Sequence, residues 1–265
     1  LPRLAIKPWI KAPPEDLILT NARVVQPSTA SLLSGNQTIL IKNGKIVSVG
    51  PSEARKSDDD IKTVDLKGAY VCPGLIDCHV HATAVPGVKV QLLSHEVTHG
   101  LLTSTCAAML LRGFTTVRDT GGASRRIALA IEGLIQGPRL IQCGKALTDG
   151  CGHGDSSPGV SGGASSTGCC GGHAVGLSRV ADGVPEVLKA AREELKAGAD
   201  FIKIMVGGGV ASETDAIETI QYTAEEIRAI TTTCRQMVTA HAYTVDAIRH
   251  AIDNGVLGIE HGNLI

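Results

Sequence analysis

Two histidines, His79 and His81, stand one residue apart at the end of the apolar segment LIDCHVH, residues 75–81. Successive side chains of a strand point to opposite faces, so these two imidazoles would share one face. Two imidazoles on one face are typical ligands of a transition metal such as zinc. The alternative is that both histidines are polar groups hydrogen-bonded at a strand end, with no ligand between them.

A lysine, Lys203, lies inside the apolar segment FIKIMV, residues 201–206. Burial among apolar neighbours disfavours the charged amine and lowers its pKa. A neutral amine can react with carbon dioxide to give a carbamate, a carboxylate-like group that can bridge two metals. The alternative is a lysine whose stem is buried while its ammonium group reaches solvent.

Two more histidines, His241 and His261, lie near the ends of the short apolar segments VTAHA and GIEHG. Either one alone is as well explained by a hydrogen bond at a strand end as by metal binding. Four imidazoles and one lysine in equivalent places are harder to explain by packing. We therefore predict a metal site formed by five residues: His79, His81, Lys203, His241 and His261.

The elements that must position these residues are short apolar strands that alternate with helices over residues 74–265. The pattern gives about six strand–helix units, with strands near 75–81, 115–120, 139–144, 201–206, 237–243 and 256–262. We predict an α/β fold of the (β/α)8 TIM-barrel type, in which the carboxyl ends of the strands carry the active site. A doubly wound sheet is the alternative, but no G-x-G-x-x-G motif follows the first strand.

Residues 1–73 are predicted to form a separate, β-rich domain, which leaves 74–265 as the barrel portion. Apolar alternation on both sides of Asn43-Gly44 predicts a hairpin. In the second domain, Thr223 and Glu226 have the spacing of a capping box and predict the start of a helix.

Composition excludes several classes of function. The net charge is −1 and aromatic residues make up 2% of the chain, so we expect no nucleic-acid partner. No apolar stretch approaches the roughly 18 residues of a membrane span, so we expect no membrane insertion. The first residues lack the features of a signal peptide, which favours a cytoplasmic protein but leaves secretion open. The eight cysteines show no framework spacing and are expected to be mostly reduced.

The ordered motifs PGLIDCHVH, FIKI, HAY and IEHG resemble those of the metal-dependent amidohydrolase superfamily, in the subtype with two metals bridged by a carboxylated lysine. The resemblance implies that His79 and His81 bind the first metal, that His241 and His261 bind the second, and that N-carboxylated Lys203 bridges them. Zinc is the default metal, with manganese, nickel and cobalt as alternatives. A hydroxide between the metals would attack a carbonyl polarised by one of them. The β-rich segment resembles the first part of the family's sandwich domain.

The phrases TTVRDTGG, GHGD and HAYT resemble the Xaa-Pro dipeptidase and ochratoxinase-like branch. The resemblance implies a small amide substrate, either a dipeptide or an N-acyl amino acid, and hydrogen bonds from His153 and Tyr243 to the substrate carbonyl. Many relatives form homo-oligomers. Hydrolysis of a cyclic amide or imidazolone is the alternative reaction of the same superfamily.

Other polar residues receive structural interpretations. The glycine-rich loop at 150–176 offers a rival zinc site, formed by Cys151, His153, Cys169, Cys170 and His173, but the spacing matches no common pattern. Arg118 and Asp119 are expected to form a structural pair near the barrel mouth, with contact to the substrate as the alternative. Glu260 is expected to point away from the metal. His250 lies on a predicted helix and is expected to be a packing or surface residue.

The family's last two barrel strands, the eighth of which carries a metal-binding aspartate, have no counterpart before Ile265. We therefore expect this chain to be a piece of a longer protein. The alternatives are a partner that supplies the missing strands, and a barrel that binds metal or a partner without turnover.

Overall fold

The computed structural model describes residues 13–51, 61–84, 95–155, 176–210, 215–234 and 237–265. The chain divides into two compact units, Leu1–Leu75 and Ile76–Ile265. None of the helices in these described ranges is long and apolar enough to cross a membrane.

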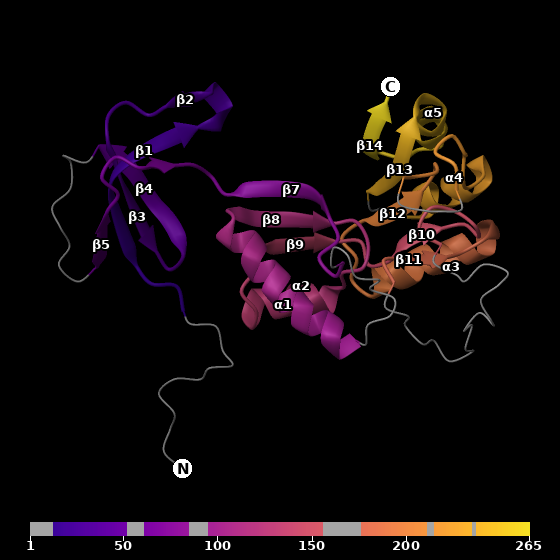
Figure 1. Ribbon diagram of the computed structural model, residues 1–265, viewed down its shortest axis with the longest axis horizontal. Helices are drawn as coiled ribbons and strands as arrows, with labels where there is room; N and C mark the ends of the chain where they lie inside the picture. The colour runs from indigo at the N-terminus through magenta and orange to yellow at the C-terminus, as the bar shows by residue number, and fades with distance from the viewer. Residues whose placement is uncertain (1–12, 52–60, 85–94, 156–175, 211–214, 235–236) are drawn as a thin grey trace, which may run out of the picture. The chain divides into compact units, whose positions relative to one another are not determined.

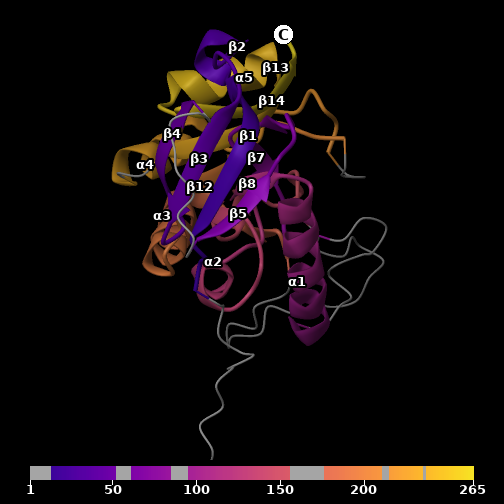
Figure 2. The ribbon, with the colours of Figure 1, turned by 90° about the vertical axis from the view of Figure 1, so that its left-hand side faces the viewer.

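The first unit is built on one six-stranded sheet (Figures 1 and 2). Its elements are β1 (Leu17–Gln26), η1 (Pro27–Thr29), β2 (Ser31–Leu32), β3 (Gln37–Lys42), β4 (Lys45–Pro51), β5 (Lys62–Asp65) and β6 (Tyr70–Val71). Strand β1 pairs antiparallel with β2 and β3 and parallel with β5 and β6. The predicted hairpin joins β3 to β4, and both Asn43 and Gly44 have the positive φ that its tight turn requires.

The second unit contains two sheets whose strands alternate with helices along the chain. The three-stranded sheet has the order β7 (Leu75–Val80), β8 (Phe114–Asp119) and β9 (Arg139–Gln142). The five-stranded sheet has the order β11 (Ser178–Val180), β10 (Ala146–Thr148), β12 (Ile202–Met205), β13 (Val238–Thr244) and β14 (Gly258–Leu264). Strands β10 to β14 pair in parallel, as do β8 and β9.

Five helices connect these strands (Figure 1): α1 (His95–Leu111), α2 (Arg125–Gly133), α3 (Gly183–Lys196), α4 (Ala224–Thr233) and α5 (Val245–Asp253). The predicted capping box is confirmed at the start of α4, where the Thr223 side chain accepts from the Glu226 amide and Glu226 accepts from Thr223. Leu147, Ile202, Ile204, Ile227 and Ile230 belong to a fully buried core between the larger sheet and its helices. A second core joins α1 and α2 to the smaller sheet.

The two sheets meet where β9 ends and β12 begins. The Asp200 amide donates to the Gln142 carbonyl over 2.8 Å, and the Gln142 amide donates to the Asp200 carboxylate over 3.0 Å. The predicted strand–helix alternation is therefore confirmed as a β/α half-barrel. In the described ranges of the second unit the strands form two sheets and not one closed barrel.

Candidate metal centre

The four histidines predicted as ligands gather in one cluster, although they come from opposite ends of the second unit. His79 lies one residue before the end of β7, and its ring centroid lies 5.4 Å from that of His81 and 4.7 Å from that of His261. The ring of His241, on β13, lies 4.5 Å from that of His261 on β14. The fold thus brings together residues that are up to 182 positions apart in the sequence.

Three of these imidazoles use one ring nitrogen for a contact within the protein. His79 Nδ1 lies 2.8 Å from Glu260 Oε2, His81 Nδ1 lies 2.9 Å from the Gly121 carbonyl, and His241 Nε2 lies 3.1 Å from the Gly208 carbonyl. A carbonyl or carboxylate oxygen only accepts, so the ring hydrogen belongs on the contacting nitrogen. Nε2 of His79 and His81 and Nδ1 of His241 are left as lone-pair donors. This is the arrangement that histidines bound to a metal adopt.

Burial also keeps the imidazoles in the form that binds a metal. Burial and the charge of the neighbouring Lys203 together lower the pKa of His241 to about 2. Burial, His79 and Lys203 together lower the pKa of His261 to about 4. The pKa of His81 is lowered by burial as well. These rings are therefore neutral at pH 7, as metal coordination requires.

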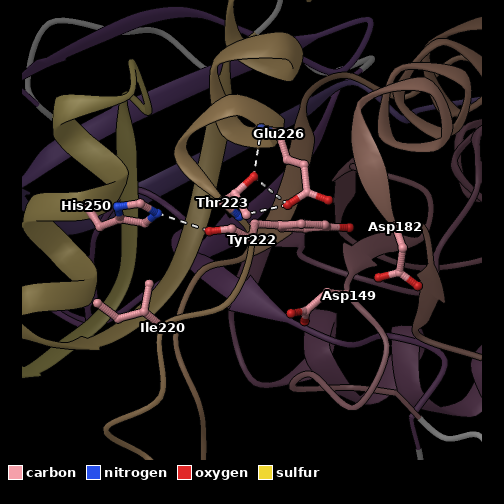
Figure 3. Close-up of a pocket in the computed structure, with 7 residues that line it drawn as sticks. All are labelled: Asp149, Asp182, Ile220, Tyr222, Thr223, Glu226 and His250. Atoms are coloured by element: carbon pink, nitrogen blue, oxygen red, sulfur yellow. Dashed lines mark hydrogen bonds between the residues drawn. The ribbon is translucent and has the colours of Figure 1, made fainter.

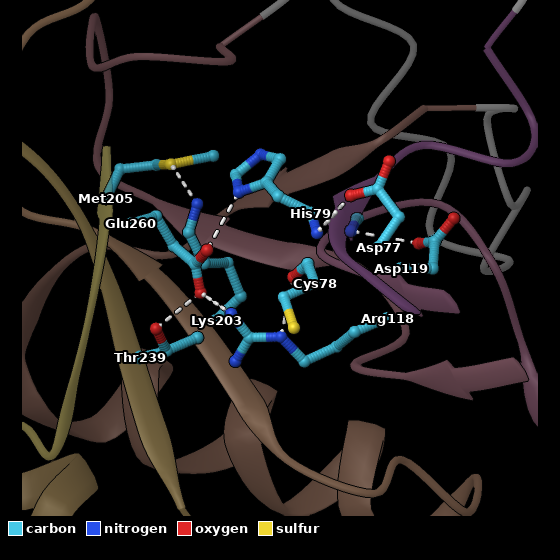
Figure 4. Close-up of polar contacts among 10 residues, drawn as sticks. Asp77, Cys78, His79, Arg118, Asp119, Lys203, Met205, Thr239 and Glu260 are labelled. Carbon is cyan, nitrogen blue, oxygen red and sulfur yellow. Dashed lines mark hydrogen bonds and ion pairs between the residues drawn. The ribbon is translucent and has the colours of Figure 1, made fainter. Parts of the chain in front are cut away.

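Lys203 is fully buried on β12, beside β13, where it pairs with Thr239 in the parallel register. Figure 4 shows its amine directed toward the Met205 sulfur, at 3.8 Å, and a thioether is a weak acceptor. Burial lowers the pKa of Lys203 to about 8, although the charge of Glu260 opposes this. Lys203 therefore does not snorkel to solvent, and at pH 7 a larger share of its amine is uncharged than in an ordinary lysine, about a tenth.

Glu260 corrects the prediction that it would point away from this cluster. Its carboxylate is buried and accepts from His79, from Arg118 Nη2 over 2.6 Å and from the Thr239 hydroxyl over 2.6 Å (Figure 4). Burial alone would raise the pKa of Glu260, but these hydrogen bonds and the Arg118 charge lower it to about 2. Glu260 is thus the anion that orients the His79 ring.

The backbone of His261 explains why two consecutive residues reach the same cluster. Strict alternation along β14 would send Glu260 and His261 to opposite faces. His261 instead has a φ of +73°, in the left-handed region that residues other than glycine rarely adopt. This local turn re-aims the imidazole toward His79 and His241.

The predicted pairing of Arg118 with Asp119 is also wrong. Arg118 binds Glu260 and donates to the Cys78 carbonyl, whereas Asp119 accepts from three backbone amides, those of Ala82, Gly121 and Ala123. Burial raises the pKa of Asp119 to about 7, and these amides offset part of the rise. Asp119 fixes the loop whose Gly121 carbonyl contacts His81.

His153 and Tyr243 lie against the imidazoles of the cluster. The His153 ring stacks on that of His241, with centroids 4.1 Å apart, and the Tyr243 ring stacks on that of His261 at 4.7 Å. Burial lowers the pKa of His153, while the nearby Asp215 raises it. Both predicted substrate-contacting residues are thus next to the predicted ligands.

The sequence analysis did not predict the glycines that pack against the site, where a larger side chain would not fit. The Gly208 carbonyl contacts His241, and a Cβ on Gly208 would overlap the Ala216 carbonyl. A Cβ on Gly209 would overlap the His153 ring, and one on Gly121 would lie 2.6 Å from the Leu177 carbonyl. The signal in the sequence is the pair of glycine runs that follow β8 and β12.

The side chains of the histidine cluster suit a metal ion in their chemistry but not yet in their positions. No group of three or more His, Cys, Asp or Glu side chains within the described ranges converges closely enough to hold an ion as it stands. The imidazole rings of the cluster must therefore turn before they can bind a metal ion together. The donors nevertheless fit a divalent metal in chemistry, because they are neutral imidazoles with a free nitrogen beside a buried amine.

The rival zinc site in the glycine-rich loop receives no support from the residues that can be placed. Cys169, Cys170 and His173 lie outside the described residues. Cys151 is an exposed free cysteine, and the ring of His153 faces His241 instead.

A separate hollow of about 390 Å³ lies beside the start of α4 (Figure 3). Its lining contains none of the predicted site residues and consists of Asp149, Asp182, Ile220, Tyr222, Thr223, Glu226 and His250. Most of its polar groups bind one another or nearby backbone, as in the His250 contact with the Tyr222 carbonyl at 3.0 Å. Asp149 Oδ1 is the exception, since it is buried without a hydrogen-bond partner in the described part of the chain.

Comparison with known proteins places the chain in a family. Residues 70–265 match the amidohydrolase family. The ochratoxinase of Aspergillus niger is 34% identical over 215 residues, which cover 71% of this chain and 42% of the ochratoxinase.

Two crystal structures each align with 94% of this chain and 62% of their own, both with a TM-score of 0.85. One is an amidohydrolase, 42% identical, and the other is a prolidase complexed with N-methylphosphonate-L-proline, 38% identical. The chain therefore spans less than two thirds of the length of these relatives. The family match covers well over half of the chain, so this chain belongs to the amidohydrolase family.

Proposed function

We propose that the protein is a metal-dependent hydrolase that cleaves amide bonds of dipeptides or N-acyl amino acids. The observation that carries the proposal is a set of three contacts, each of which engages one ring nitrogen of His79, His81 or His241. The other nitrogen of each ring has no hydrogen-bond partner in the part of the chain that the structure describes. The similarity to an ochratoxinase and to a prolidase supports the choice of an amide substrate.

Two divalent metal ions, with zinc as the default, would be held by the five predicted residues. His79 and His81 would offer Nε2 to the first metal, and His241 would offer Nδ1 to the second, together with His261. Bound metals of this kind polarise a carbonyl and activate water. We propose a (β/α)8 barrel as the complete fold around this site, supported by the parallel half-barrel.

Lys203 would bridge the metals after carboxylation. In that step the lone pair of Nζ attacks the carbon of carbon dioxide, so that a nitrogen–carbon bond forms while one C=O π bond breaks and leaves its electron pair on oxygen. The proton that leaves the nitrogen passes to water. The lowered pKa of about 8 supplies the neutral amine that the step needs. The carbamate would also replace a poorly partnered buried cation with an anion between two cations, which relieves the cost of burial.

His153 and Tyr243 would contact the substrate carbonyl. Each stacks on a predicted ligand, so a substrate carbonyl near the metals would also be near these two rings. Polar groups in such a place stabilise the charge that develops on the oxygen during hydrolysis. The small-molecule amide is the partner we propose, and homo-oligomerisation stays a prediction.

The test is an assay of the full-length protein, purified with zinc and bicarbonate, against dipeptides, N-acyl amino acids and cyclic amides. We expect hydrolysis of the first two classes, loss of hydrolysis after a chelator, and recovery when zinc and bicarbonate return. Faster hydrolysis of the cyclic amides would favour the alternative reaction, hydrolysis of a cyclic amide or imidazolone. No hydrolysis of any amide by a metal-loaded protein would overturn the proposal.

A further inference from the structure

The imidazole of His153 is confined on several sides. One face stacks on His241, with an angle of 15° between the rings. The His153 amide donates to the Gln221 side chain over 2.9 Å, which fixes the backbone of the loop. A Cβ at position 209 would overlap the ring, so only glycine fits there.

A buried carboxylate, that of Asp215, lies at the remaining edge of this ring. Asp215 Oδ2 is 3.3 Å from His153 Nδ1, and it accepts from the Gly209 amide over 2.8 Å and from Gln221 Nε2 over 3.4 Å. The Asp215 side chain is 2% exposed. Its second oxygen, Oδ1, has no hydrogen-bond partner within the described ranges.

Packing alone does not account for an aspartate at this place. A buried carboxylate is costly unless its oxygens are fully hydrogen-bonded, and among the described residues one oxygen of Asp215 has no partner. The contact with His153 has the distance of an ion pair but not the alignment of a hydrogen bond. Such contacts in catalytic sites often become well aligned only when a ligand binds.

We infer that Asp215 is a positioning residue, which holds His153 with Nδ1 engaged so that Nε2 is the atom presented to the substrate. This inference rests on the proposed function, in which His153 contacts the substrate carbonyl. A carboxylate only accepts, so the hydrogen on Nδ1 is kept in either protonation state of the ring.

The first test is a double-mutant cycle in the full-length, zinc-loaded protein. Asp215→Ala should lower kcat on the order of 100-fold, the scale expected when a catalytic group is misplaced by about 1 Å. KM should change much less, and the metal count per chain should not change. His153→Ala should lower kcat at least as far, and the double variant should be no worse than His153→Ala alone.

Three further variants separate positioning from folding. Asp215→Asn keeps an acceptor for the Gly209 amide, so it should recover part of the lost kcat. Gly209→Ala leaves Asp215 in place but pushes the His153 ring aside, so it should lower kcat without loss of metal. Glu225→Ala removes an exposed carboxylate and should match the wild type.

A measurement that does not depend on turnover keeps the inference separate from the proposed function. In the ¹⁵N spectrum of histidine-labelled protein, with His153 assigned by its loss in His153→Ala, Nδ1 should be the protonated nitrogen. An unprotonated Nδ1 would overturn the inference even if the protein is inactive. In an active protein, losses that multiply in the double variant, or full activity of Asp215→Ala, would also overturn it.

Discussion

The histidine cluster and the hollow beside α4 are both rich in polar side chains, but their hydrogen bonds differ. In the hollow, Glu226 accepts from the Gly183 and Thr223 amides, and the Tyr222 hydroxyl donates to the Ala181 carbonyl. These contacts fix the starts of α3 and α4. In the cluster, within the described ranges, one nitrogen of each of His79, His81 and His241 has no hydrogen-bond partner, and the buried Lys203 amine has only the Met205 thioether as a hydrogen-bond acceptor.

This difference separates two uses of a polar residue. Groups whose donors and acceptors are paired within the protein stabilise the fold. Polar groups that are buried without a hydrogen-bond partner lower the stability of the fold. They are typical of functional sites, where a bound ligand supplies the missing partner. We therefore expect the cluster to bind a ligand and most polar residues of the hollow to stabilise the fold. Changes in the two regions should therefore affect different measurements.

The largest effect is expected at Lys203. Lys203→Ala removes the group proposed to bridge the metals, so the full-length protein should lose at least one metal per chain and nearly all activity. Elemental analysis and the amide assay measure both. Retention of both metals and of full activity would contradict the proposal that a carbamate on Lys203 bridges the metals.

A matched pair of histidine substitutions compares the two regions directly. His241→Ala removes a predicted ligand and should lower the metal count and reduce activity to near background. His250→Ala makes the same chemical change in the hollow and removes only the contact with Tyr222, so it should keep its metal. Equal metal loss in the two variants would mean that the cluster is not the binding site.

The cost of burying Lys203 should appear in the stability of the metal-free protein without bicarbonate. The amine has a pKa of about 8 in the folded state and 10.5 ordinarily. Between these values the unfolded chain binds more protons, so this group makes the free energy of unfolding rise with pH, by on the order of 3 kcal/mol. Below pH 8 the full cost is present.

Lys203→Met removes the titrating amine and keeps the apolar stem. The difference in unfolding free energy between this variant and the wild type should therefore shrink as the pH rises from 8 to 10.5. Denaturant unfolding at several pH values measures it. A difference that does not vary with pH would show that the folded protein does not bury a charged amine.

A smaller effect is expected from the group that orients His79. Glu260→Gln keeps the shape of the side chain and an acceptor for Thr239 but removes the negative charge. Metal affinity should fall roughly 10- to 100-fold, as is typical when the partner of a metal-bound histidine is changed. Competition with a zinc chelator measures the affinity, and an unchanged value would return Glu260 to a purely structural role.

The smallest effect is expected in the hollow. Thr223→Ala removes the N-cap of α4 and should cost about 1 kcal/mol of unfolding free energy. The metal count and the kcat of the folded protein should stay at wild-type values. A change in kcat without a change in stability would contradict the division between the two regions.

Much of the secondary structure in both units could be predicted from the sequence because its signals are local. Apolar strands, the Asn43-Gly44 hairpin and the Thr223–Glu226 capping box follow from short segments, and all three are confirmed. The gathering of the histidines could be predicted because strand ends in a parallel β/α fold meet on one side.

The contacts around the histidines could not be predicted in the same way. Glu260 and His261 both point toward the cluster because His261 has a positive φ. The alternation of side chains along a strand does not predict this. The carbonyls of Gly121 and Gly208 and the carboxylate of Asp215 come from loops, whose course depends on tertiary packing. The two loop carbonyls determine which ring nitrogen is engaged on His81 and on His241.

The measurement that tests the central claim most directly is a metal count on the full-length wild-type protein, purified from cells supplied with zinc and bicarbonate. The account predicts two metal ions per chain, removed by a chelator and restored together with activity. A count near zero in a folded protein would contradict it, because the free imidazole nitrogens would then have no metal to bind.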